Sequence, residues 1–157
     1  MNKTVVMILA SILLMSAAYA APADDVAKPI RQFIDGFNSG DTKSGFAAYA
    51  SGNITIMDEF APHLWAGRNA AHTWAADYDK HATATGVSDG SVKYGDATRT
   101  DVAGDLAYVV IPTVYSYKDH GKPTQEEGQM TFVLHRGSGG WKIRAWTWTG
   151  VKPHAAK

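Results

Sequence analysis

Apolar residues recur at helical spacing in the first half of the chain. One stripe consists of Val26, Ile30, Phe33, Ile34 and Phe37, and a second of Ala71, Trp74, Ala75 and Tyr78. Both stripes follow the period of an amphipathic helix, and Asp or Asn residues that can cap a helix precede them. Asp41 can cap a short helix between them. The pattern predicts helices over residues 24–38, 42–49 and 70–81.

Beyond Gly86 the apolar residues alternate with a period of two, which is typical of strands. The predicted strands cover residues 54–58, 88–100, 106–118, 124–136 and 141–149. Residues 59–67 contain Pro62 and Gly67 and are expected to form a loop. Because consecutive strands joined by short turns pair antiparallel, we predict an α+β domain. Its curved antiparallel sheet would pack on helices, in the order α-α-β-α-β-β-β-β.

Residues 1–20 have the parts of a secretory signal peptide. Lys3 supplies a positive charge, an apolar run follows, and Ala18-Tyr19-Ala20 forms a small-x-small cleavage site. A retained membrane anchor is the alternative, but the run is shorter than the roughly 20 residues that span a bilayer. We therefore predict cleavage before Ala21, a single domain over 21–157, and a periplasmic or secreted protein without membrane association after cleavage.

The composition narrows the classes of function open to this domain. The 157 residues include 15 Lys and Arg and 15 Asp and Glu, so the formal net charge is zero. A neutral chain lacks the basic excess with which proteins bind nucleic-acid phosphates, and we predict no nucleic-acid partner. Cysteine is absent, which excludes disulfides, thiolate metal sites and a cysteine nucleophile. Glycine-rich phosphate-binding and dinucleotide motifs are also missing, so no cofactor is expected.

Five short motifs occur in an order that resembles a known superfamily. They are Phe37-Asn38-Ser39-Gly40-Asp41, Ile56-Met57-Asp58, Gly67-Arg68-Asn69-Ala70-Ala71, Gly104-Asp105-Leu106-Ala107-Tyr108 and Gly140-Trp141-Lys142-Ile143. Over residues 26–150 the chain resembles the NTF2-like superfamily, in its SnoaL-like and ketosteroid-isomerase-like branch. The resemblance implies a cone-shaped domain with a pocket at its open end and frequent dimerisation through the outer sheet face. It implies no single activity, because this fold carries isomerases, dehydratases, cyclases, hydrolases and binding proteins.

Asp58 is the first candidate for chemistry. It follows a strand whose Ile54 and Ile56 are expected to be buried, and it precedes an aromatic loop. Loss of solvation there would raise its pKa and make it a usable base. The resemblance implies the same role, because isomerase-like relatives carry their general-base carboxylate at the corresponding place. Asp58 could instead only cap the loop, and the neighbouring Glu59 could be the working carboxylate.

The other polar groups of the isomerase site are missing. Alignment with those relatives puts Phe33 in place of a tyrosine, and Met130 or Thr131 in place of a protonated acid. Phe33 cannot donate a hydrogen bond, and Thr131 is at best a weak neutral donor. Steroid isomerisation is therefore disfavoured, because the electrostatic stabilisation that usually dominates such catalysis is absent.

Histidine offers a second route to acid–base chemistry. His63 lies in the loop that follows Asp58 and could act with that carboxylate, although an exposed loop histidine is the alternative. His72 and His81 fall on opposite faces of one predicted helix, so they cannot chelate a common metal ion. No metal-binding motif is present, and we predict no metal site.

Aromatic residues supply the candidate walls of a pocket. Trp74 and Tyr78 are expected to line its mouth, and Phe33, Trp65 and Thr131 are the other expected pocket residues. For Trp74 and Tyr78 the alternative is a place in the core, which an apolar helical stripe favours.

The last strand carries two tryptophans whose direction decides the expected partner. Simple alternation turns Trp141 toward the helices and puts Trp146 and Trp148 on the outer face, where a sheet-to-sheet homodimer would cover them. A bulge after Arg144 would reverse this assignment and turn Trp148 into the pocket.

Two functions follow from these residues. The first is a binding domain that holds a small apolar or aromatic molecule without chemistry. The second is a cofactor-free lyase or isomerase that uses Asp58, with His63 or Tyr78 as its partner. An Asp58 that shares one enclosed cavity with a second titratable group would favour the enzyme, and a solvent-facing Asp58 would favour the binding domain.

Overall fold

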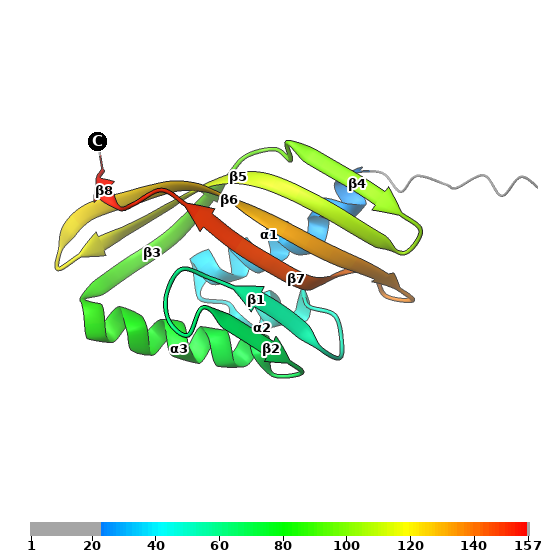
Figure 1. Ribbon diagram of the computed structural model, residues 1–157, viewed down its shortest axis with the longest axis horizontal. Helices are drawn as coiled ribbons and strands as arrows, with labels where there is room; N and C mark the ends of the chain where they lie inside the picture. The colour runs from blue at the N-terminus through cyan, green and yellow to red at the C-terminus, as the bar shows by residue number, and fades with distance from the viewer. Residues whose placement is uncertain (1–22, 157) are drawn as a thin grey trace, which may run out of the picture.

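The structure is a computed structural model that describes residues 23–156, so the predicted signal peptide lies outside the described residues. Within these residues, three helices and eight strands follow one another (Figure 1). The helices are α1 (Ala23–Ser39), α2 (Thr42–Ala47) and α3 (Ala70–Thr85). The strands are β1 (Ile54–Met57), β2 (Leu64–Gly67), β3 (Val87–Tyr94), β4 (Arg99–Ala103), β5 (Leu106–Asp119), β6 (Lys122–Gly137), β7 (Gly140–Gly150) and β8 (His154–Ala155). None of these helices is long and apolar enough to cross a membrane.

All strands join one curved sheet in the order β2-β1-β7-β6-β5-β3, with β4 added beside β5 and β8 beside β6. The predicted α+β class is confirmed. The sheet is mixed rather than antiparallel throughout, because β1 lies parallel to β7, with Ile56 opposite Trp146. Strands β1 and β7 are distant in the sequence and share no hairpin, so no turn constrains their relative direction.

Two stretches differ locally from the predicted elements. The expected loop over 59–67 contains β2, which forms a hairpin with β1. The expected strand over 88–100 is split into β3 and β4, which pair with different halves of β5. The break lies opposite Pro112 of β5, which has no N–H to donate to a neighbouring strand.

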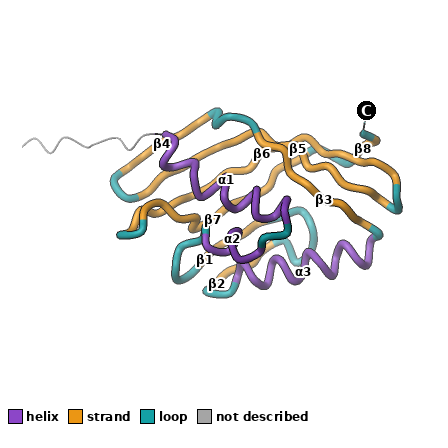
Figure 2. The backbone as a smooth tube through the Cα atoms, turned by 180° about the vertical axis from the view of Figure 1, so that it is seen from behind, coloured by secondary structure: helices purple, strands orange, loops and turns teal. Residues whose placement is uncertain are grey.

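The helices cover one face of the sheet, as Figure 2 shows from the side opposite to Figure 1. The stripe of α1 packs there: Val26, Ile30 and Ile34 are buried against the inward residues of the long strands. Asp41 caps α2, since its Oδ1 accepts a hydrogen bond of 3.0 Å from the Ser44 amide. Helix α3 contacts β1, β2 and β3, and it leaves space between itself and the sheet at one end of the molecule.

A bulge in β7 sets the direction of its tryptophans. Leu134 pairs with Ile143 but Val133 pairs with Ala145, so Arg144 is an extra residue in the ladder. Trp146 is therefore buried on the helix side, 3% exposed, and Trp148 faces the same side. The expectation that both tryptophans lie on the outer face is wrong, and the alternative with a bulge is confirmed. Neither side chain can form the predicted dimer contact.

Candidate functional site

A cavity of about 120 Å³ opens between α1, α3 and the inner face of the sheet. Nine aromatic side chains line it: Phe33, Phe37, Phe60, Trp74, Tyr78, Tyr115, Tyr117, Trp146 and Trp148. Its polar lining consists of Asp58, Glu59, His81 and Glu126, besides the tyrosine hydroxyls. The site thus combines an aromatic wall with three carboxyl groups.

Asp58 directly follows β1, and its carboxylate is held by two donors. Its Oδ2 accepts a hydrogen bond of 2.8 Å from the indole Nε1 of Trp74, and its Oδ1 accepts one of 2.8 Å from the Glu59 amide. Burial raises the pKa of Asp58 above its usual value of 3.8, and the two hydrogen bonds oppose this rise. The carboxylate is therefore fixed in position and more basic than an exposed aspartate.

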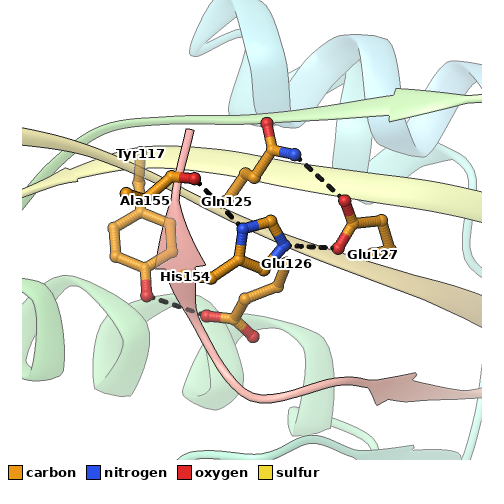
Figure 3. Close-up of polar contacts among 6 residues, drawn as sticks. All are labelled: Tyr117, Gln125, Glu126, Glu127, His154 and Ala155. Carbon is orange, nitrogen blue, oxygen red and sulfur yellow. Dashed lines mark hydrogen bonds and ion pairs between the residues drawn. The ribbon is translucent and has the colours of Figure 1, made fainter. Parts of the chain in front are cut away.

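Glu59 and Glu126 face each other at the mouth of the cavity. Burial raises the pKa of Glu59 from 4.5 to about 8, and the nearby carboxyl of Glu126 adds to this rise. Glu126 is only 2% exposed, and its Oε1 accepts a hydrogen bond of 2.8 Å from the Tyr117 hydroxyl (Figure 3). Its Oε2 has no hydrogen-bond partner, and neither has the indole N–H of Trp148. At neutral pH, Glu59 is therefore protonated.

A pair of tyrosines supplies neutral donors to the same cavity. The hydroxyls of Tyr78 and Tyr115 lie 2.6 Å apart, and burial raises the pKa of both. Only one hydroxyl can donate to the other, so the second keeps a hydrogen for a ligand. Gly90 makes room for the pair, because a Cβ there would lie 2.5 Å from the Tyr78 oxygen.

The structure brings together some of the residues expected in the pocket. Asp58 lines the cavity with Phe33, Trp74 and Tyr78. The rings of Trp74 and Tyr78 stack with centroids 5.9 Å apart. These two residues form a wall of the cavity as well as part of the apolar cluster around it.

Three other expected site residues lie elsewhere. Trp65 is buried behind Phe60, with ring centroids 4.9 Å apart, and its Nε1 donates to Asp77. Thr131 is on the outer face of β6, because alternation along the strand turns its neighbour Met130 into the cavity. His63 is exposed, and its Nδ1 lies 3.3 Å from the carbonyl oxygen of Asp58 rather than from its carboxylate.

The sequence interpretation missed several residues that line the cavity. Glu126 is in phase with the buried Met130 and Phe132 of β6, and a charged residue at a core position was a signal that could have identified it. Tyr115 and Tyr117 likewise share the inward face of β5. His81 stacks on Phe60 with centroids 5.1 Å apart. It, rather than His63, is the histidine of the site.

The polar groups of the cavity do not form a metal site. Within residues 23–156, no three His, Asp or Glu side chains are arranged to hold a metal ion. What the arrangement offers is acid–base chemistry, with a buried carboxylate beside protonated neighbours.

Comparisons with solved structures identify proteins with a similar fold. The chain is similar to a ketosteroid isomerase-like protein from Erwinia carotovora atroseptica, with 18% identity, a TM-score of 0.64 and coverage of 83% of this chain and 96% of that one. It is similar to the S. rosetta CaMKII hub, with 22% identity, a TM-score of 0.64 and coverage of 84% and 98%. A hexachlorocyclohexane dehydrochlorinase has a TM-score of 0.69 at 9% identity, with coverage of 85% and 88%.

At these identities the likeness shows the fold alone, which is that of the NTF2-like and ketosteroid-isomerase-like superfamily. Among proteins of curated function, none matches the sequence. A family model, described as a SnoaL-like domain, matches residues 26–147. That span contains α3, all but the first three residues of α1, and every residue that lines the cavity except Trp148. The chain therefore belongs to the SnoaL-like domain family.

Proposed function

We propose that the protein binds a small, largely apolar molecule in the aromatic cavity and that Asp58 transfers a proton on it, as in a cofactor-free lyase or isomerase. One observation carries this proposal: the Asp58 carboxylate shares a cavity with nine aromatic side chains and with the titratable groups Glu59, Glu126 and His81. This shared cavity supports an enzyme over a simple binding domain.

The size of the cavity limits the ligand to about one ring. Its volume is about 120 Å³, and an engineered apolar cavity of about 150 Å³ takes up benzene. A steroid is far larger than this space, which agrees with the missing donors of the isomerase site.

The roles within the reaction follow from the protonation states. Asp58 is the base, because two hydrogen bonds stabilise its ionised form while burial raises its pKa. The free hydroxyl hydrogen of the Tyr78–Tyr115 pair is placed to donate to an oxygen of the substrate. Support for such chemistry on this fold comes from the isomerase-like and dehydrochlorinase neighbours.

Deuterium exchange tests the base without knowledge of the substrate. In D₂O, the protein should speed deuterium incorporation beside the carbonyl of a one-ring ketone such as cyclohexanone, followed by NMR. Asp58→Asn keeps the acceptor for Trp74 but removes the base, so it should abolish exchange and leave binding intact. Equal exchange by Asp58→Asn would sink the catalytic role, and binding without exchange by either protein would favour the pure binding domain.

Tryptophan fluorescence tests binding with matched variants. A one-ring ligand should quench the emission of Trp148, which lines the cavity, and not that of Trp65, which lies outside it. Quenching should therefore persist in Trp65→Phe and weaken in Trp148→Phe. Failure of every one-ring compound to quench saturably would refute a cavity of this kind.

Export and dimerisation belong to the same proposal. Export predicts a mature protein in the periplasmic fraction or the medium, with Ala21 as its first residue on N-terminal sequencing. For dimerisation, one structural neighbour is a hub domain, and the outer sheet face exposes Leu106, Tyr108 and Val133. Val133→Lys should then convert a dimer to a monomer in light scattering; a wild-type monomer would refute the dimer.

A further inference from the structure

We infer that the ligand of this cavity is a small organic cation, an ammonium group whose charge lies between Glu59 and Glu126 and whose carbon part rests on Trp148 and Tyr115. The inference rests on the proposed function for the existence of the binding cavity, and it adds the chemical class of the molecule.

The ionisable groups that line the cavity are mainly acidic. Three carboxyl groups face it, from Asp58, Glu59 and Glu126, whereas no Lys or Arg does. Elsewhere in the described chain, several acidic side chains have basic partners: Lys80 pairs with Asp77 and Lys118 with Asp89. His81 is the single basic side chain of the lining. An incoming cation would supply the countercharge that the protein itself does not provide.

Glu126 leaves one place open for a donor. The residue is 2% exposed, and Tyr117 donates to its Oε1, but its Oε2 has no partner. A buried carboxylate oxygen without a donor is unfavourable. An ammonium N–H aimed at Oε2 would satisfy it with a charge-assisted hydrogen bond.

Aromatic side chains line the cavity beside Glu126, as they do in sites that recognise ammonium groups. The rings of Tyr115 and Trp148 are nearly perpendicular, at 77°, with centroids 6.4 Å apart, and Tyr117 stacks on Tyr115 at 4.8 Å. Cations are attracted to such faces. Two glycines make room for the Trp148 ring: a Cβ would lie 2.9 Å from the ring if it were on Gly128 and 2.7 Å if it were on Gly150.

A neutral hydroxyl or a metal ion fits this place less well. A hydroxyl group could donate to Glu126 but would bring no positive charge to a cavity that three carboxyl groups line. A metal ion needs several oxygen or nitrogen ligands, and the described residues offer no group of three. The lining around Glu126 is aromatic instead, which suits the carbon part of an organic cation.

Binding of a cation should release a proton. The groups facing Glu59 are Asp58 beside it, Glu126 of β6, Tyr117 of β5 and Trp148 of β7. Burial and Glu126 raise the pKa of Glu59 to about 8, so Glu59 is protonated at neutral pH. A bound ammonium favours the carboxylate, and the proton goes to the buffer. Affinity for a cation should therefore increase as the pH rises toward 8.

Calorimetric titration with three one-ring probes of different charge tests the inference. Benzylammonium should bind at least about tenfold more tightly than benzyl alcohol, as one charge-assisted contact predicts, and benzoate should not bind. Tetramethylammonium, which has no proton of its own, should release protons on binding, measured in two buffers of different ionisation enthalpy. Benzyl alcohol that binds as tightly as benzylammonium, or binding of tetramethylammonium without proton release, would overturn the inference.

Glu126→Gln and Glu127→Gln form a matched pair of variants on adjacent positions. Glu127 is not among the residues that line the cavity, and it contacts His154 and Gln125 (Figure 3). Glu126→Gln should weaken benzylammonium binding about tenfold and leave benzyl alcohol unchanged, whereas Glu127→Gln should change neither. Equal losses in both variants would contradict the inference. If no probe of any charge binds, the proposed function fails as well; if only benzyl alcohol binds, the cationic ligand alone is refuted.

Discussion

Replacing Glu126 by glutamine should change how the stability of the protein depends on pH. In the wild-type protein the folded state holds the Glu59 proton up to about pH 8, whereas the unfolded chain releases it near 4.5. Folding therefore binds a proton between these values, and the free energy of unfolding falls as the pH rises through this window. In Glu126→Gln, the side-chain amide can donate to an ionised Glu59, so this fall should be smaller.

The magnitude follows from the pKa of Glu59 and its exposure. The pKa of Glu59 is 4.5 in the unfolded chain and about 8 in the folded protein, and this difference corresponds to about 5 kcal/mol of the free energy of unfolding if no solvent screening reduces it. The Glu59 side chain is exposed at the cavity mouth, and water screens such a group, so we expect about 2 kcal/mol. Burial is the largest cause of the raised pKa and Glu126 the second. Replacing the Glu126 carboxyl should thus reduce the fall in the free energy of unfolding with rising pH by roughly 1 kcal/mol.

Urea denaturation near pH 5 and near pH 9 measures this difference. Each variant lacks one carboxyl group of the wild-type protein and keeps all the others. A change in the pH dependence of the free energy of unfolding that occurs in Glu126→Gln but not in Glu127→Gln therefore comes from the Glu59–Glu126 pair. Glu127→Gln also loses the contact of Glu127 with His154, which makes it a control for the loss of one carboxylate. The reasoning is refuted if Glu126→Gln loses as much stability as wild type between the two pH values, or if it is the less stable protein near pH 9.

Three further substitutions test the packing of the site and the fold. Trp74→Phe removes a donor to Asp58, so the pKa of Asp58 should rise further in an NMR titration, with a loss of about 2 kcal/mol in urea denaturation. Gly90→Ala places a Cβ 2.5 Å from the Tyr78 oxygen and should cost about 1–3 kcal/mol in the same assay; an unchanged midpoint would contradict the close contact. Asp41→Ala removes the cap of α2 and should cost about 1 kcal/mol, with no effect on ligand binding.

The helices and strands were largely predictable because their signals are local. The stripe of α1 and the alternation of β6 each bury one face, and those periods are visible in the sequence. The placement of Asp58 after a buried strand was visible for the same reason. The split between β3 and β4 was not, because it depends on Pro112 of β5, which lies across the sheet from the break.

The site itself depends on contacts between distant parts of the chain. Glu59 follows β1, Glu126 belongs to β6, and Trp148 ends β7, so their meeting requires the whole sheet to be assembled. The single extra residue in β7, Arg144, turns Trp146 and Trp148 from the outer face to the cavity, because each shift by one residue reverses the side of a strand. No periodicity in the sequence locates such a bulge, since the register is set by the neighbouring strand.

The sequence by itself thus determined the class of fold, the family, the apolar faces of the elements and the position of Asp58 directly after a buried strand. Only the tertiary structure decided which titratable groups share the cavity with Asp58: Glu59, Glu126 and His81 line it, and His63 does not. The physical reason is that hydrophobic periodicity acts within one element, whereas the charge balance and the pKa of a buried group depend on neighbours that only folding brings near.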